Sequence, residues 1–232
     1  MGIPPNYRSF WAKCFSSFVG LALLCPIFIT RAQIPASRSA VDLATGTYEP
    51  RDPAMGDNVA WVMQQLGAAG KVVIWAHNGH VSAAPYAPGY DTMGSMLRKR
   101  FGVDYVAIGT LFSRGEFQAA SLPFPANGNP LVRAFRVGEA APGSVESVLA
   151  ETRLAALALD LRRLRSSARV QAWFKSDHAA RSIGNRFDPT NELDFYESVV
   201  LADRFNMIVF VAHTTRSHPT ANAQVKFRID PN

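Results

Sequence analysis

The chain has 232 residues, of which 48% are apolar, and this length favours one globular domain with a hydrophobic core over two. Three basic residues, Arg8, Lys13 and Arg31, lie before residue 33 in a stretch without Asp or Glu. The rest of the chain carries 21 basic and 18 acidic residues, a net charge of only +3. Such a weak balance argues against a nucleic-acid-binding protein.

The N-terminus has the pattern of a secretory signal peptide over residues 1–32. Basic residues precede an apolar stretch at 14–30, and small side chains at Thr30 and Ala32 fit cleavage after Ala32. The alternative is an uncleaved membrane anchor, because 14–30 is only slightly shorter than the roughly 20 residues that span a bilayer. The sequence therefore predicts an exported protein, periplasmic or secreted, with anchoring and membrane contact through 14–30 as the alternative.

Cysteine usage and composition divide the chain further. Both cysteines, Cys14 and Cys25, fall inside the leader, so the mature part has no thiol. This excludes a cysteine nucleophile, a Cys-based zinc site and a disulfide framework. Residues 33–50 are polar and rich in Ala, Ser and Thr, which predicts a linker, and residues 51–232 form the predicted domain.

The domain opens with a predicted helix and a predicted strand. Apolar spacing predicts a helix over 52–66, with Asp52 as its N-cap and a proline in its first turn. Residues 71–76 are rich in β-branched side chains and predict a buried strand that ends at His77 and His80.

The later elements alternate between helices and strands. A helix is predicted from Asp91 or Thr92 to Phe101, then a hairpin whose strands 104–112 and 116–120 turn at 113–115. Further strands are predicted over 131–137, 154–161 and 207–212, with a helix after the cap Ser144. This alternation predicts an α/β fold with a mostly parallel sheet flanked by helices.

Several catalytic motifs are missing from the sequence. It has no G-x-S-x-G elbow, P-loop, G-x-G-x-x-G after a strand, or H-E-x-x-H, so serine-hydrolase and nucleotide-binding functions lose their main support. His77 and His80 remain at a strand end, where α/β proteins build their sites, with Arg51 upstream and Glu116 on another segment. Two imidazoles and a carboxylate can bind a metal, or His can act as a general base beside an arginine oxyanion clamp. The spacing alone does not choose between these two.

A series of short motifs resembles the erythromycin esterase family. The specific one is W-A-H-N-x-H at residues 75–80. The less specific ones occur in the family's order and span about 48–215: Arg51-Asp52 with Met55, Asn58 and Trp61; Met93-Gly94; Gly109-Thr110; Gly115-x-Phe117; 142–146; 160–162; Arg181-x-Ile183-Gly184; and Asp188-Pro189.

The resemblance implies hydrolysis of a carboxylic ester, in named members the macrolactone of a macrolide antibiotic, which would confer antibiotic resistance. The partner is then a small ester or lactone, and a His activates water without a metal or other cofactor. By matched position, His77 and His80 are the family's paired active-site histidines and Arg51 its active-site arginine. The expected substrate-binding residues are Asn78, Trp75 and Glu116.

The chain departs from the family in length. Members are about twice as long, and their general-base His and its partner Glu precede the region matched here, whereas no position before Asp42 is His, Asp or Glu. We therefore expect an incomplete, truncated family domain, its C-terminal half, that self-associates and hydrolyses macrolides at no more than background. The alternatives are a non-catalytic ligand-binding remnant and a metal-dependent hydrolase that uses His77 and His80.

The first testable prediction concerns processing. If residues 1–32 are a secretory signal, the exported protein should begin at Gln33, because the small residues before it suit the signal peptidase. Intact-mass measurement of an exported sample checks the new terminus. A membrane-bound species that still carries Met1 would instead support the anchor.

Overall fold

The computed structural model describes residues 51–86, 89–123, 131–164, 167–218 and 220. The leader at 1–32 and the linker at 33–50 lie outside these residues, so both stay predictions. Among the helices that are described, none combines the length and the apolar character that a membrane crossing requires.

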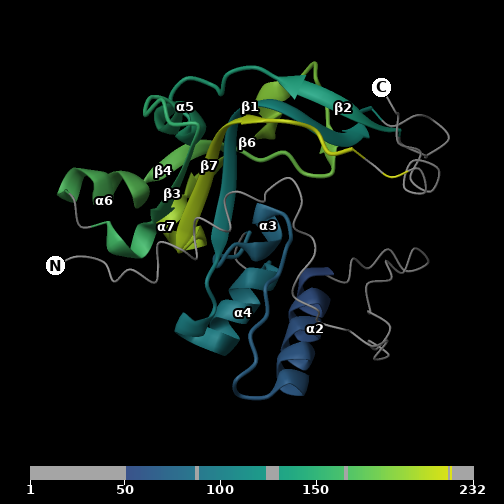
Figure 1. Cartoon of the computed structure of the whole chain (residues 1–232), viewed down its shortest axis with the longest axis vertical. Coiled ribbons are helices and arrows are strands. Elements are labelled where there is room, and N and C mark those ends of the chain that lie inside the picture. The colour runs from purple at the N-terminus through teal and green to yellow at the C-terminus, as the bar shows by residue number, and fades with distance from the viewer. Residues whose placement is uncertain (1–50, 87–88, 124–130, 165–166, 219, 221–232) are drawn as a thin grey trace. The chain divides into compact units, whose positions relative to one another are not determined.

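The helices begin and end where the sequence supplies local signals (Figure 1). Helix α2 (Arg51–Leu66) stops before Gly67, whose φ is +73°. Thr92 caps α4 (Met93–Phe101) and Ser144 caps α5 (Val145–Ala150), which confirms the helices predicted at both places. The other helical elements are α3 (Asn78–Val81), α6 (Ala168–Phe174), α7 (Leu201–Arg204), η1 (Gly102–Asp104), η2 (Leu161–Arg163) and η3 (Glu192–Phe195).

The main sheet has five strands in mixed directions. Strand β1 (Ile108–Ser121) pairs parallel with β7 (Met207–Thr214) and with the short β5 (Arg186–Phe187), and antiparallel with β2 (Val132–Val137). Strand β3 (Ala156–Asp160) joins the far edge of β7 antiparallel, and β4 (Asp177–Arg181) and β6 (Tyr196–Val200) form a separate antiparallel pair. The predicted α/β sheet with flanking helices is confirmed, but its directions are mixed rather than mostly parallel because β2 and β3 oppose their neighbours.

The hairpin predicted at 104–120 is wrong, because these residues form the single long strand β1. Strand β1 pairs with β7 up to Gly115 and with β2 from Gly115 onward. Gly115 itself is opposite Thr214 of β7 and Val137 of β2. Gly115 has φ +132°, and a Cβ there would lie 2.2 Å from the Thr214 carbonyl oxygen. The glycine therefore marks a close approach between strands that lets β1 continue, and not a turn.

The strand predicted at 71–76 is also wrong, although the segment keeps the alternation that suggested it. Val73 and Trp75 are 93% and 84% exposed, whereas Ile74 and Ala76 pack against the core. Within the described part of the chain, no backbone hydrogen bond joins 71–76 to a strand. The alternation of exposed and packed side chains was present, but a strand also needs the edge of a neighbouring strand to pair with.

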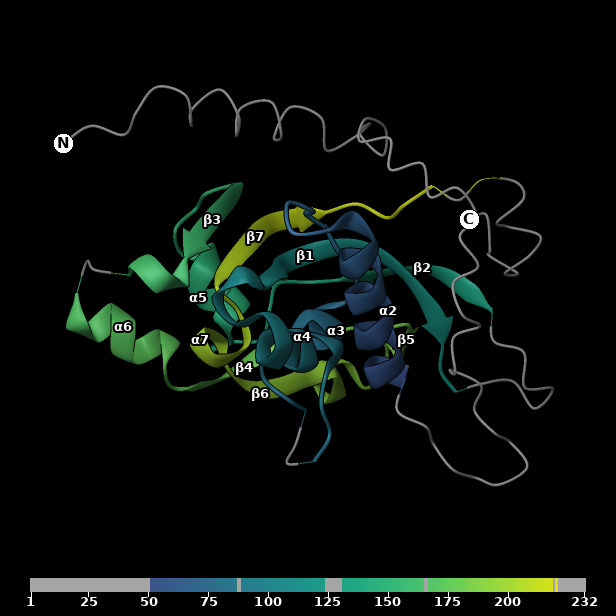
Figure 2. The same cartoon turned by 90° about the horizontal axis from the view of Figure 1, so that it is seen from below.

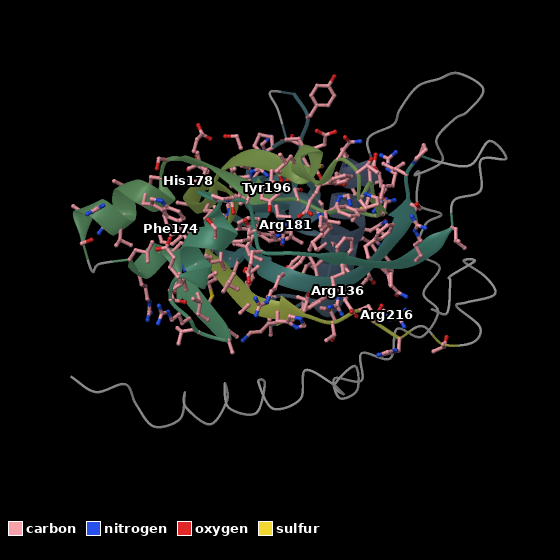
Figure 3. All side chains as sticks on the ribbon, turned by 90° about the horizontal axis from the view of Figure 1, so that it is seen from above. Arg136, Phe174, His178, Arg181, Tyr196 and Arg216 are labelled. Atoms are coloured by element: carbon pink, nitrogen blue, oxygen red, sulfur yellow. The ribbon has the colours of Figure 1, made fainter. Side chains whose placement is uncertain are left out.

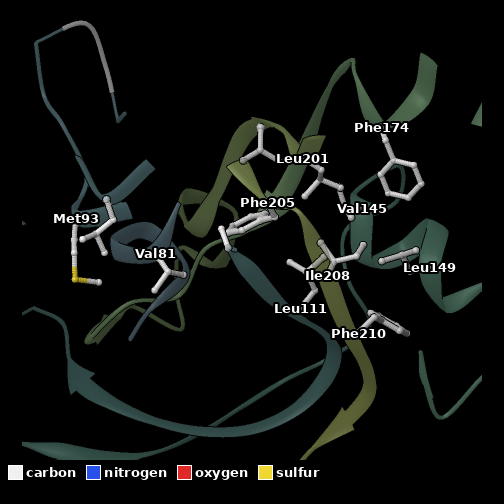
Figure 4. Close-up of a cluster of buried hydrophobic side chains, with 14 residues drawn as sticks. Val81, Met93, Leu111, Val145, Leu149, Phe174, Leu201, Phe205, Ile208 and Phe210 are labelled. Carbon is white, nitrogen blue, oxygen red and sulfur yellow. The ribbon is translucent and has the colours of Figure 1, made fainter. Parts of the chain in front are cut away.

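The main core lies against one face of the sheet. Figure 4 shows Leu111, Ile208 and Phe210 of the sheet facing side chains from the helices. Figure 2 shows α4, α7, β4 and β6 on one side of the strands β1, β7 and β3. A second, aromatic cluster forms around Phe135 and Phe187 near the β1–β2 ladder. Residues of β1 pack in both clusters, Leu111 in the first and Ala119 in the second.

Helix α5 carries a fully buried carboxyl group. Glu146 is 0% exposed and lies in the first turn of α5, where the helix dipole favours a negative charge. Its Oε1 accepts the Arg181 backbone N–H at 3.0 Å. Burial raises the pKa of Glu146 above its ordinary 4.5, against the opposing effect of the backbone N–H groups around it.

The second prediction concerns stability against pH. Because the raised pKa means that the folded protein holds this proton more tightly than the unfolded chain, Glu146 favours folding most at low pH, and this contribution is lost as pH rises through the folded pKa. Glu146→Gln removes the titration and keeps an oxygen for the Arg181 N–H. The free energy of unfolding of the variant minus that of the wild type should rise with pH in urea experiments.

The control is Glu151→Gln, which removes an exposed carboxyl at the other end of α5. Its difference from the wild type should depend on pH less than that of Glu146→Gln. A difference between Glu146→Gln and the wild type that stays constant across pH would contradict the buried-acid interpretation.

Candidate active site

The starts of α2, α3 and α4 meet at one place (Figure 1). Helix α4 approaches α3 closely at Gly94, where a Cβ would lie 2.4 Å from the carbonyl oxygens of both Val81 and Ser82. The buried cap Thr92 adds a bond from its Oγ1 to the Ser82 carbonyl at 2.6 Å. These contacts fix the short turn that carries both predicted histidines.

His80 is held between a carboxylate and a guanidinium. Its Nδ1 lies 2.6 Å from Oδ1 of Asp52, and its Nε2 lies 3.1 Å from Nη2 of Arg51. A carboxylate accepts and a guanidinium donates, so Nδ1 carries the proton and Nε2 accepts. The structure therefore brings the predicted pair Arg51 and His80 together and sets the ring in its neutral Nδ1–H form.

Asp52 is the site residue that the sequence analysis missed. It is 6% exposed, and its Oδ2 accepts the backbone N–H of Met93 at 3.2 Å, at the first residue of α4. The prediction that Asp52 caps its own helix is thus wrong, because its carboxylate serves the N-terminus of the neighbouring helix and His80. The signal available in the sequence was an acidic residue directly beside the candidate Arg51.

His77 is engaged at both ring nitrogens. Its Nδ1 accepts the Gly79 N–H at 3.1 Å, which caps α3, and its Nε2 lies 2.9 Å from the carbonyl oxygen of Ile183. An amide donor at Nδ1 and a carbonyl acceptor at Nε2 define the neutral Nε2–H form. His77 and His80 therefore have opposite tautomers although they are three residues apart.

Asn78 joins the histidine turn to the sheet. Its Oδ1 accepts the Thr110 N–H at 2.9 Å, and its Nδ2 donates to the Thr110 carbonyl at 2.7 Å. Asn78 thus takes the two backbone groups of β1 that a neighbouring strand would take.

The structure does not bring Trp75 and Glu116 to this turn in the same way. Trp75 projects from the extended segment and is 84% exposed. Glu116 lies six residues beyond Thr110 on β1, about 20 Å along the strand. The hydrogen bond from Arg136 at 2.5 Å lowers the pKa of Glu116, and Arg216 adds to this effect. Figure 3 shows Arg136 and Arg216 near each other, away from the centre of the fold.

The space beside the histidines is small. His77 and Asn78 line a crevice of about 20 Å³ together with Arg181 and Ser182, which is room for about one water molecule. A larger hollow of about 380 Å³ lies elsewhere, between α6, α7 and Phe205. Arg51 is exposed and the His80 side chain is 23% exposed, and neither lines this crevice.

The two imidazole rings do not converge. Their centroids are 6.5 Å apart with an interplanar angle of 77°. In the part of the chain that the structure describes, no group of three or more His, Cys, Asp or Glu side chains is placed to hold a metal ion.

Comparisons with known proteins give a family and a fold. A family model described as erythromycin esterase matches residues 33–214. A solved succinoglycan biosynthesis protein and a solved protein from Bacillus cereus are each similar to this chain, with a TM-score of 0.58 and 21% identity. An erythromycin esterase mutant in its open conformation matches with a TM-score of 0.48 and 16% identity.

These likenesses cover unequal shares of the chains. The first two alignments cover 71% of this chain and 38% of the other, and the third covers 70% and 36%. This chain therefore spans well under half the length of the structures it matches. The search of curated proteins finds no match.

The third prediction tests how Asn78 works. Asn78→Ala removes both hydrogen bonds to the Thr110 backbone, and because these groups are exposed to water, the free energy of unfolding should fall by about 0.5–1.5 kcal/mol. Asn191→Ala, which removes an exposed amide in a loop, should cost less. Unchanged stability of Asn78→Ala in urea unfolding, together with weaker ligand binding, would favour the substrate contact expected from the sequence.

Proposed function

The chain belongs to the erythromycin esterase family, and from that premise we propose that it is a carboxylic ester hydrolase in which His80 activates water. The observation that supports this assignment is the pair formed by Arg51 and His80, with Asp52 behind it. It joins a base, a residue that orients the base, and a permanent positive charge, which are the parts that attack on an ester needs.

Substrate binding would break the hydrogen bond between Arg51 and His80. The Arg51 side chain is exposed, so its guanidinium can turn to donate to the carbonyl oxygen of an ester. This movement frees the lone pair on Nε2 of His80 for a water molecule. The base therefore becomes available when the ester has taken the arginine.

The proton then passes through His80. Water donates its proton to Nε2 as its oxygen attacks the carbonyl carbon, and the oxyanion of the tetrahedral intermediate pairs with Arg51. Asp52 accepts the Nδ1–H throughout and stabilises the imidazolium. When the intermediate collapses, the leaving alkoxide takes the proton from Nε2, which yields an acid and an alcohol and restores neutral His80.

The substrate class is proposed from the exposure of Arg51 and from the family. A small or a large ring ester can reach Arg51 without entering the 20 Å³ crevice beside His77. A macrolactone is the substrate that the family name suggests, and its opening would inactivate a macrolide antibiotic. No metal or other cofactor takes part in this proposal.

The proposal extends to location and association. Export through residues 1–32 is proposed from the sequence pattern, with anchoring and membrane contact through 14–30 as the alternative. Self-association is supported by the exposed Val73 and Trp75, which lie on a segment whose backbone is unpaired among the described residues.

A second candidate is ligand binding without turnover. The observation that favours it is that all four ring nitrogens of His77 and His80 already have protein partners. If Arg51 stays on His80 when a ligand is bound, no imidazole can take a proton from water. This candidate agrees with the background activity expected from the sequence analysis.

The fourth prediction separates the two candidates. If the hydrolase proposal holds, the purified chain adds one water to the lactone of erythromycin at a rate above the background expected from the sequence analysis. His80→Gln should then lower kcat/KM by about 10²–10⁴-fold because the general base is lost. His213→Gln, at an exposed position of β7, is the control and should keep the wild-type rate. Ring opening is followed by mass spectrometry.

One result would count against the hydrolase assignment and another against His80 as its base. Erythromycin that binds but is not opened would select the binding candidate. Lactone opening by His80→Gln at the wild-type rate would show that another residue is the base.

A further inference from the structure

Two sequence motifs stay unused by the proposed reaction, and the structure brings them together behind His77. One is the turn at 142–146 that ends in Glu146, and the other is the segment 181–184 after β4. Glu146 is fully buried and accepts the Arg181 backbone N–H at 3.0 Å. Its second oxygen, Oε2, is buried without a hydrogen-bond partner among the described residues.

The Arg181 side chain connects several elements. It is 1% exposed and donates to the Ser113 carbonyl of β1 at 2.5 Å and to Oε1 of Glu192 in η3 at 3.0 Å. Its guanidinium lies 5.3 Å from the ring centre of Phe112 and 5.4 Å from that of Tyr196. Figure 3 shows Arg181 beside Tyr196 in the middle of the fold. A buried charge with this many contacts holds the backbone at residue 181 in one place.

The chain contacts His77 two residues after Arg181. The Ser182 N–H donates to the Phe195 carbonyl at 2.7 Å, and the next carbonyl, that of Ile183, lies 2.9 Å from Nε2 of His77. Arg181 and His77 also line the same 20 Å³ crevice. With 181 and 182 both anchored, the Ile183 oxygen has little freedom to leave the imidazole.

We propose that Glu146 and Arg181 are positioning residues that hold the Ile183 carbonyl on His77 and so lock His77 in its Nε2–H form. A locked Nε2–H is a donor and cannot take a proton from water. His77 is then a fixed cap that donates to the Ile183 carbonyl, and the role of base falls to His80 alone. The Nε2–H tautomer of His77 is inferred from the geometry alone. Only the statement that His80 is the sole base rests on the proposed function.

The lock explains why a buried carboxyl without full hydrogen bonding is tolerated at α5. Glu146 is far in sequence from His77, and it acts through the backbone of β4 and not through contact with the ring. A purely structural role would require only a folded core. The positioning role requires in addition that His77 has one tautomer.

The test is the long-range ¹H–¹⁵N spectrum of the histidine rings in the full chain, labelled with ¹⁵N-histidine and assigned with His77→Gln and His80→Gln. Wild-type His77 should show the Nε2–H pattern. Glu146→Ala and Arg181→Lys should shift His77 toward a mixture of tautomers, because the Ile183 carbonyl is released, while His80 keeps its Nδ1–H pattern. Glu146→Gln retains an acceptor for the Arg181 N–H and should restore the His77 signal.

Each outcome bears on the lock and not on hydrolysis. If either folded variant, Glu146→Ala or Arg181→Lys, keeps the pure Nε2–H signal of His77, the proposal is overturned. Should both variants fail to fold, the wild-type spectrum still decides, since an Nδ1–H or averaged His77 ring would refute the lock. Loss of the signal at His77 and His80 alike would show general loosening and would also count against it.

Discussion

The carboxylate of Asp52 is the group on which the candidate site depends. One oxygen accepts the Nδ1–H of His80 and the other accepts the Met93 N–H, so a single buried side chain joins α2, α3 and α4. The same bond leaves Nε2 of His80 facing Arg51. Because a buried carboxylate is costly without full hydrogen bonding, its position also fixes how closely the three helix starts approach.

The two histidines are alike in sequence and different in chemistry. Charged side chains are the partners of His80, a carboxylate at Nδ1 and a guanidinium at Nε2. Backbone groups surround His77, namely the Gly79 N–H and the Ile183 carbonyl, and these favour one neutral form. The geometry thus gives different hydrogen-bond partners to a pair that a sequence motif presents as equivalent.

The sequence predicted those parts of the fold and site that depend on local signals. Thr92 and Ser144 cap helices as expected, since capping needs only the next three residues. The strand at 71–76 and the turn at Gly115 were wrong because the first depends on a neighbouring edge and the second on the approach of β7. Asp52 was missed for the same reason: its partners are 28 and 41 residues away.

The most direct test of this account is a double-mutant cycle between Asp52 and His80. Asp52→Ala, His80→Ala and the double variant are unfolded in urea, which needs no substrate and no assumption about turnover. The account predicts a coupling free energy of at least about 1 kcal/mol, because each side chain loses its partner when the other is removed. Additive effects within about 0.5 kcal/mol would contradict it and would show that the carboxylate does not hold the imidazole.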